Sequence, residues 1–258
     1  MKVQLLPSSF DPGGAVSQRQ HLSCLVIDGS VAFDAGSLAF SCSDEERANI
    51  RDIFISHAHL DHIAGLPIFI DDLFASLTAP VRVHATAEMI AVLERDIFNW
   101  SVYPKFSELK NSHGTVIEYH PFTSGAAFQV RHLTFVPFEV NHNVSSVGAI
   151  VSDGRTSVGI TGDTARTEEI WQAFRYCKDL SAVLVECAFP NELSDLATVS
   201  HHLTPAELSV ELEKFGRPDV PVYVINIKPM YRDRVVEEIQ ELNRPGLQIL
   251  EIGRDYEF

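Results

Sequence analysis

The sequence predicts an α/β (α+β) fold, a four-layer αββα sandwich in which two mixed β-sheets pack face to face and carry helices on their outer surfaces. Two observations lead to this prediction. Strand-type and helix-type segments follow one another in two successive β-then-α halves, a pattern best satisfied by two packed sheets with helices outside. The 258 residues are 45% hydrophobic, enough for one substantial core, and no linker, repeat or low-complexity tract divides them. We therefore expect residues 1–258 to form a single domain.

The first half begins with a β-meander. Apolar runs predict its three strands, over residues 3–6, 22–27 and 31–34. Asp28-Gly29, between the second and third strands, is typical of a tight hairpin turn. Ser43 and Glu46 have the spacing of a capping box, which indicates a short helix. The apolar run over residues 51–56 predicts another strand, which leads directly into a His-rich segment over residues 57–62.

Helices and strands alternate through the middle of the chain. Periodic apolar residues predict helices over residues 63–77 and 86–98, with a strand over 81–84 between them. The polar segment 99–114 is expected to be a loop. Apolar runs then predict a second β-rich region, in which Asp153-Gly154 provides the last turn, over residues 115–119, 127–140 and 146–160.

The last third repeats the β-then-α order. Thr204, Pro205 and Glu207 supply an N-cap, a proline in the first turn and an acid at the third position, which together indicate the start of a helix. The remaining periodicity predicts two more helices, over residues 167–176 and 232–242. It also predicts three more strands, over residues 182–186, 222–227 and 248–252.

The charge limits the classes of partner. The chain carries 20 Lys and Arg residues against 35 Asp and Glu residues, a formal net charge of −15 that is spread along its length. An acidic surface repels the phosphate backbone of nucleic acids, so no large RNA or DNA partner is expected. A small anionic substrate is still compatible with this charge, because divalent metal ions reverse the local potential around a site.

The sequence indicates a cytoplasmic protein. The N-terminus lacks the charged start and long apolar run of a signal peptide. The apolar segment 63–77 contains Asp71 and Asp72 and is shorter than the ~20 residues that a membrane span needs, so no membrane partner is expected. Four widely spaced cysteines without a C-x-x-C pair fit reduced thiols better than a disulfide framework: Cys24, Cys42, Cys177 and Cys187.

The segment His57-Ala58-His59-Leu60-Asp61-His62 places three imidazoles and one carboxylate within six positions. Imidazole nitrogens and carboxylate oxygens are ligands of Zn²⁺, Mn²⁺ and Fe²⁺. Alternate residues of an extended loop share a face, so His57 and His59 can reach one ion, while Asp61 and His62 point toward a second. A polar loop before a helix is the alternative interpretation, and four donors at this spacing favour the metal.

Three later positions offer further donors. His142 follows a predicted strand, Asp163 lies in a Gly-Asp-Thr turn, and His202 precedes the capped helix. Taken singly, Asp163 has the alternative of a turn-forming residue and His142 that of an exposed loop histidine, while His201 competes with His202 for the same role. The three positions together predict a two-metal centre, in which Asp163 can bridge both ions through its two oxygens.

The order of these motifs resembles the metallo-β-lactamase superfamily. Three motifs are more narrowly similar to the class II cyclic-nucleotide phosphodiesterases, namely residues 59–66, Gly162-Asp163-Thr164 with Trp171 downstream, and His202-Leu203-Thr204-Pro205. The resemblance implies the αββα metallo-β-lactamase sandwich. It also implies two sets of metal ligands bridged by Asp163, with His57, His59 and His142 on one ion and Asp61, His62 and His202 on the other.

The resemblance further implies a cofactor and an activity. Two divalent ions per chain, Zn²⁺ first and Mn²⁺ or Fe²⁺ as alternatives, are expected to share a bridging hydroxide that attacks a 3′,5′-cyclic nucleotide. Cyclic AMP or cyclic GMP would give the 5′-monophosphate, and Asp61 or Asp163 would orient the hydroxide as the catalytic residue. The alternatives are an RNase Z-like phosphodiesterase, a thioester or lactone hydrolase of the same superfamily, and a metal-binding sensor without catalysis.

The sequence departs from the resemblance at Asn226-Ile227-Lys228-Pro229, where related chains often have His first. Asn226 is expected to bind substrate through a hydrogen bond, but an amide cannot supply a proton as imidazolium does. Lys228 is expected to pair with phosphate, with an exposed strand-end lysine as the alternative.

Homodimers are common enough to make a homodimer the default expectation for the oligomeric state. The other histidines without an evident partner are interpreted as non-ligands: His21, His84, His113, His120 and His132.

Overall fold

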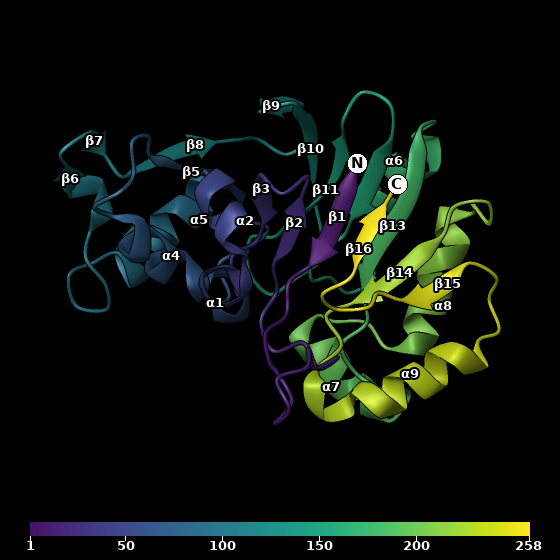
Figure 1. Ribbon diagram of the computed structural model, residues 1–258. Helices are drawn as coiled ribbons and strands as arrows, with labels where there is room; N and C mark the ends of the chain where they lie inside the picture. Colours follow the sequence, from purple (N-terminus) through teal and green to yellow (C-terminus); the bar gives the residue numbers. More distant parts are fainter.

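The computed structural model describes residues 1–258 and contains two mixed seven-stranded sheets, as the sequence predicts (Figure 1). The first sheet has the order β16 (Asp255–Glu257), β1 (Lys2–Leu5), β2 (Leu25–Ile27), β3 (Val31–Phe33), β4 (Asp52–Phe54), β5 (Val81–Ala85) and β8 (Ile117–Pro121). The second has the order β15 (Leu247–Ile249), β14 (Val222–Ile225), β13 (Leu180–Glu186), β12 (Ser157–Ile160), β11 (Val147–Ser152), β10 (Leu133–Glu139) and β9 (Phe128–Val130).

Each sheet changes from antiparallel to parallel pairing part-way across. β1, β2 and β3 form the predicted antiparallel meander, and Asp28 and Gly29 turn the hairpin with φ angles of 48° and 61°, the positive values that a tight hairpin needs. From β3 through β4 and β5 to β8 the strands run parallel. In the second sheet β9 to β12 are antiparallel, whereas β12 to β15 are parallel.

The two sheets pack face to face through apolar side chains. Phe54 on β4 contacts Phe33 on the neighbouring strand at 4.7 Å between ring centroids, and Phe135 on β10 of the other sheet at 5.2 Å. These rings belong to one cluster of 44 buried residues that draws on both sheets. A second cluster, of 17 residues, lies between the second sheet and its outer helices and contains Trp171 and Phe215. The fold is therefore the predicted αββα sandwich.

The helices lie on the outer sides of the sheets (Figure 1). Beside the first sheet are α1 (Leu38–Ser41), α2 (Asp44–Asn49), α3 (Leu60–Ile63), α4 (Gly65–Leu73) and α5 (Ala87–Val92), the last continued by a π-helical turn over Leu93–Ile97. Beside the second sheet are α6 (Glu169–Tyr176), α7 (Ser194–Ser200), α8 (Pro205–Phe215) and α9 (Arg232–Glu241). Short 3₁₀ turns complete the chain, at Phe106–Glu108, Asn191–Leu193 and Pro229–Tyr231. The capping boxes predicted at Ser43 and Thr204 are both present.

Two predicted segments differ from the structure. The segment 99–114 is not only loop, because β6 (Lys110–Asn111) and β7 (Gly114–Thr115) form a small hairpin. Asn111 accounts for this turn, since its side-chain oxygen accepts backbone N–H groups from His113 and Gly114. Its amide also donates to two carbonyl oxygens in the segment just after α4. The predicted strand 127–140 is broken into β9 and β10 at Arg131, which has a φ of 57°.

The two ends of the chain lie together in the first sheet. β16 pairs antiparallel with β1, and the Met1 amino group donates to the Phe258 carbonyl at 3.0 Å. Neither β16 nor α7 is among the elements predicted from the sequence. None of the helices combines the length and the apolar character needed to cross a membrane.

Candidate metal centre

The His-rich segment lies where the buried strand β4 ends. The chain stays extended after Phe54, and His59 is the N-cap of α3, with φ −71° and ψ 148°. The His57 side chain is fully buried, His59 is half-buried, and His62 in α3 is buried. The extended loop and the first turn of the helix together point these three imidazoles into the same region, as the spacing predicts.

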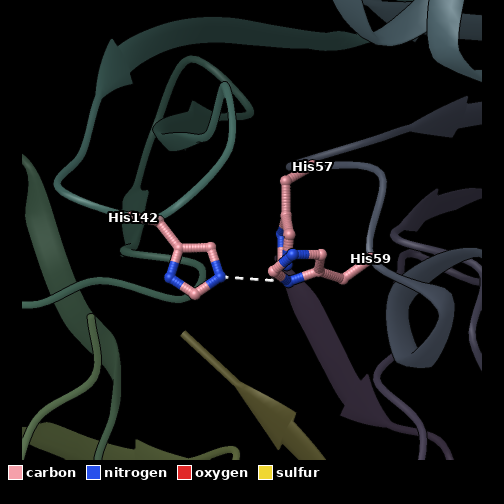
Figure 2. Close-up of side chains that lie close together, drawn as sticks. All are labelled: His57, His59 and His142. Atoms are coloured by element: carbon pink, nitrogen blue, oxygen red, sulfur yellow. Dashed lines mark hydrogen bonds between the residues drawn. The ribbon is translucent and has the colours of Figure 1, made fainter. Parts of the chain in front are cut away.

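The second sheet brings three more donors to the same place. His142 follows β10, Asp163 follows β12 through a turn at Gly162 with φ 63°, and His202 lies between α7 and α8. Figure 2 shows His142 facing His57 and His59 across the centre, with His142 Nε2 3.1 Å from His59 Nδ1. Possible ligand atoms lie within 4.8 Å of one another in three overlapping groups: His57, His59 and His142; His57, His62 and Asp163; His142, Asp163 and His202.

The donors are suited to divalent metal ions. Burial holds the pKa of His57 well below its ordinary value, and lowers that of His142 to about 4, so both imidazoles are neutral at physiological pH. His57 Nε2 is buried without any hydrogen-bond partner. A buried nitrogen lone pair without a partner is unfavourable in an empty protein interior and is what a metal ligand requires. The residues therefore fit the metal chemistry that the motifs predict.

Two buried carboxylates that the sequence analysis did not single out orient the imidazoles. Asp34, directly after β3, accepts from His62 Nδ1 at 2.6 Å. Glu186, at the end of β13, accepts from His202 Nδ1 at 2.7 Å. Such hydrogen bonds fix the tautomer and leave the other nitrogen free for a metal. One feature of the sequence could have pointed to these two carboxylates, because each lies at the carboxyl end of a buried strand.

Asp163 is the buried acid among the predicted metal ligands. Its Oδ2 atom is 3.3 Å from His62 Nε2, 3.9 Å from His57 Nε2 and 4.0 Å from His202 Nδ1. Burial alone would raise the pKa of Asp163, but the neighbouring His62 outweighs it and holds that pKa well below its ordinary value. A single carboxylate oxygen therefore faces ligand candidates from both predicted metal positions.

A polar cavity of about 90 Å³ opens beside the centre. Lys228 lines it, with Nζ 3.1 Å from Asp61 Oδ2, and Asn226 lines it, with Nδ2 donating to Asp163 Oδ1 at 2.6 Å. The structure thus places both predicted substrate contacts at the centre. Asp61 lines the cavity as well, but it belongs to none of the three groups of closely spaced donors.

The contacts of the nearby histidines show which of them face the centre. His202 is buried in the centre, whereas the His201 side chain turns to Asn141, at 2.8 Å from its Oδ1 atom. The His201 backbone has φ 53°, and its carbonyl accepts from His142 Nδ1 at 2.9 Å. His84, predicted to be a strand residue, lies on β5 and contacts Asp52 rather than the centre.

Residues 25–219 match the family model of the beta-lactamase superfamily domain. The chain belongs to this superfamily. This match covers the His-rich segment, His142, Asp163 and His202, and it confirms the predicted superfamily. Divalent metal ions are the cofactors that go with this fold, and the clustered His and Asp side chains fit them.

Relatives and structural neighbours agree with this assignment. The chain is 27% identical over 233 residues to a "Probable 3′,5′-cyclic-nucleotide phosphodiesterase" of Yersinia pestis. This match covers 79% of the chain and 66% of that relative. It is 28% identical over 143 residues to the nuclear ribonuclease Z of Triticum aestivum, covering 54% and 74%. Unliganded yeast PDE1 shares the fold, with a TM-score of 0.74, 17% identity and 97% of both chains covered. The chain thus spans about two thirds of the length of the Yersinia relative.

Proposed function

We propose that this protein is a metal-dependent phosphodiesterase that hydrolyses 3′,5′-cyclic nucleotides, cyclic AMP or cyclic GMP, to 5′-monophosphates. The observation that carries the proposal is the small polar cavity beside the donor cluster. There Lys228 offers a positive charge and Asn226 an amide next to Asp163, in a chain whose net charge is −15. The relative of Yersinia pestis named as a phosphodiesterase supports the same substrate class.

We propose two ion positions for the centre. His57, His59 and His142 would hold the first ion, and Asp163 would face both. His62 and His202 would hold the second, with Asp61 as a further ligand that must turn from Lys228 to reach it. Zn²⁺ is proposed for both positions, because imidazole suits Zn²⁺ and the set is mainly imidazole. When bound, such ions supply Lewis-acid chemistry, neutralising phosphoryl charge and lowering the pKa of water.

The chain's own residues would bind and orient the diester. Lys228 would release Asp61 and pair with a non-bridging phosphate oxygen, as a flexible ammonium group can. Asn226 would hold Asp163 through its amide, because its side-chain oxygen already accepts from Gln20. Asp61 or Asp163 would accept a hydrogen bond from the attacking water and direct it at phosphorus. The buried His57 and His62 exclude bulk water from the floor of the centre.

The proposal is tested with purified protein loaded with Zn²⁺ or Mn²⁺. We expect cyclic AMP or cyclic GMP to be converted to the 5′-nucleotide and not the 3′-nucleotide, as separated by chromatography. Chelation and His59→Ala should each abolish turnover, whereas His113→Ala, at an exposed histidine on the β6–β7 hairpin, should not. Metal-loaded protein that hydrolyses no cyclic nucleotide would refute the substrate assignment.

Hydrolysis of RNA is the second candidate, because a ribonuclease Z is among the relatives of the chain. The net charge of −15 disfavours it, since a polymer of phosphates needs a basic surface for binding. Cleavage of a precursor tRNA at a rate above that of a cyclic nucleotide would favour this candidate. A thioester or lactone substrate would be recognised by acyl cleavage without activity on bis(4-nitrophenyl) phosphate.

The proposal includes three further features of the protein. Residues 1–258 would act as one domain, since the last strand, β16, pairs with the first strand, β1, in the same sheet. A reducing, cytoplasmic location is supported by four free cysteines. A homodimer is proposed as the oligomeric state, and light scattering coupled to gel filtration measures it directly.

A further inference from the structure

The cavity beside the metal centre contains an imidazole that does not belong to the donor cluster. His21 lines this cavity together with Asp61, Asn226 and Lys228. It is exposed, and its side chain has neither a hydrogen bond nor an ion pair in the structure. A free imidazole at the rim of the cavity is therefore available to a bound substrate.

The backbone around His21 is held in place from both sides. Gln20 exchanges two hydrogen bonds with Asn226, because its side-chain oxygen accepts the Asn226 backbone N–H at 2.9 Å and its amide donates to the Asn226 side-chain oxygen. Ser23 donates its backbone N–H to the Asp61 carbonyl at 2.8 Å. The His21 N–H donates to Ser8 Oγ at 2.7 Å. The backbone at His21 therefore keeps a defined position beside the centre.

The other titratable groups that line the cavity are already engaged. His62 is buried between Asp34 and Asp163. Lys228 is paired with Asp61 and provides the positive charge for the phosphate. Gln20 and Asn226 are amides, which do not transfer protons at neutral pH. Of these groups, only His21 combines an imidazole with freedom from a partner.

We propose that His21 is a catalytic residue, the general acid that protonates the leaving oxygen of the diester. This inference rests on the proposed phosphodiesterase function. The oxygen of water forms a bond to phosphorus, and the bond from phosphorus to O3′ breaks with its electron pair on O3′. The His21 imidazolium gives its proton to O3′ and becomes neutral. The proton released by water passes to solvent, from which His21 regains one, so the cycle balances.

The test compares poor and good leaving groups. A sugar alkoxide or a phenolate is a poor leaving group that needs a proton, whereas 4-nitrophenolate departs without one. We expect His21→Asn to reduce turnover of cyclic AMP and of diphenyl phosphate about 100-fold, a typical effect of losing a general acid. Turnover of bis(4-nitrophenyl) phosphate should stay within about threefold of the wild type. His113→Asn, at an exposed histidine away from the centre, is the matched control and should leave all three substrates unaffected.

Two measurements besides activity accompany the kinetics. The metal content of His21→Asn should equal that of the wild type, because His21 belongs to none of the donor groups. The ring resonances of His21 should shift in NMR spectra when 5′-AMP binds, while those of His113 should not. A perturbed metal content or an unshifted His21 ring would contradict the assignment.

The outcomes distinguish the inference from the proposed function. An equal loss on all substrates, or no loss on any, would overturn the role of His21 while leaving the phosphodiesterase function intact. A wild type that hydrolyses aryl diesters but no cyclic nucleotide would overturn only the cyclic substrate, since diphenyl phosphate still tests His21. A wild type inactive on every diester would overturn both.

Discussion

The carboxylate behind His62 offers the sharpest test of the metal centre. Asp34 accepts three hydrogen bonds, from the Ser56 backbone N–H at 2.8 Å, the Ser56 hydroxyl at 2.8 Å and His62 Nδ1 at 2.6 Å. Asp34→Asn keeps the shape of the side chain but leaves one acceptor oxygen and adds an NH₂ group. If that NH₂ group faces His62, it donates to Nδ1 and moves the ring proton to Nε2, the nitrogen that points at Asp163.

The size of the effect follows from these contacts. A hydrogen bond to a charged group is worth about 1.5–3 kcal/mol, and one such bond to Asp34 cannot be remade by the amide. Loss of a carboxylate behind a ligating histidine typically costs about 10–100-fold in metal affinity. We therefore expect Asp34→Asn to weaken binding of the ion that we propose for His62 and His202 by 10–100-fold. Binding of the ion proposed for His57, His59 and His142 should be much less affected.

The assay is competition for Zn²⁺ with a chelator of known affinity, combined with metal analysis of the dialysed protein. Asp52→Asn is a matched control, because Asp52 is also a buried acid of the first sheet that accepts from a histidine, His84, at 3.0 Å and from Arg82. Both variants should lose thermal stability, but only Asp34→Asn should lose affinity for the second ion. Equal metal binding by the two variants would refute the proposed role of Asp34.

Three further predictions concern acid stability, the support of Asn226 and the packing of the second sheet. Burial opposes ionisation of Asp52, but hydrogen bonds from its two partners outweigh burial and lower its pKa from 3.8 to about 2. Its ionisation therefore contributes about 2 kcal/mol above pH 4 that is lost as the pH falls toward 2, and urea titrations of Asp52→Asn should lack this change. Gln20→Ala frees the Asn226 amide and should lower metal affinity about tenfold in the same chelator assay, whereas unchanged affinity would show that Asn226 holds its position alone. Gly148→Ala would place a Cβ 2.5 Å from a carbonyl oxygen of β12 and should destabilise the protein by about 1–3 kcal/mol in thermal unfolding, while Gly13→Ala, with nothing within 4 Å, should not.

The sequence by itself determined the fold class and most of the donor set. Local patterns suffice for these, because period and turn chemistry act over a few residues, as at Asp28-Gly29 and at the cap of α8. The His57 to His62 segment is equally local, since its spacing places several donors on one loop. Where a local side chain decided the structure against the simple pattern, as Asn111 did in the β6–β7 hairpin, the prediction of a loop was incomplete.

Only the tertiary structure decided which distant residues meet. Asp34 reaches His62 because β3 and β4 run parallel side by side. Glu186 reaches His202 from the carboxyl end of β13, at the edge of the second sheet where the parallel strand β12 leads to Asp163. The choice of His202 over His201, which the sequence analysis made from the adjacent Leu-Thr-Pro motif, agrees with a left-handed backbone at His201 that turns its ring out of the centre. The position of His21 beside Lys228 comes from contacts more than 200 residues apart. Such pairings depend on strand order and packing, which no short sequence pattern encodes.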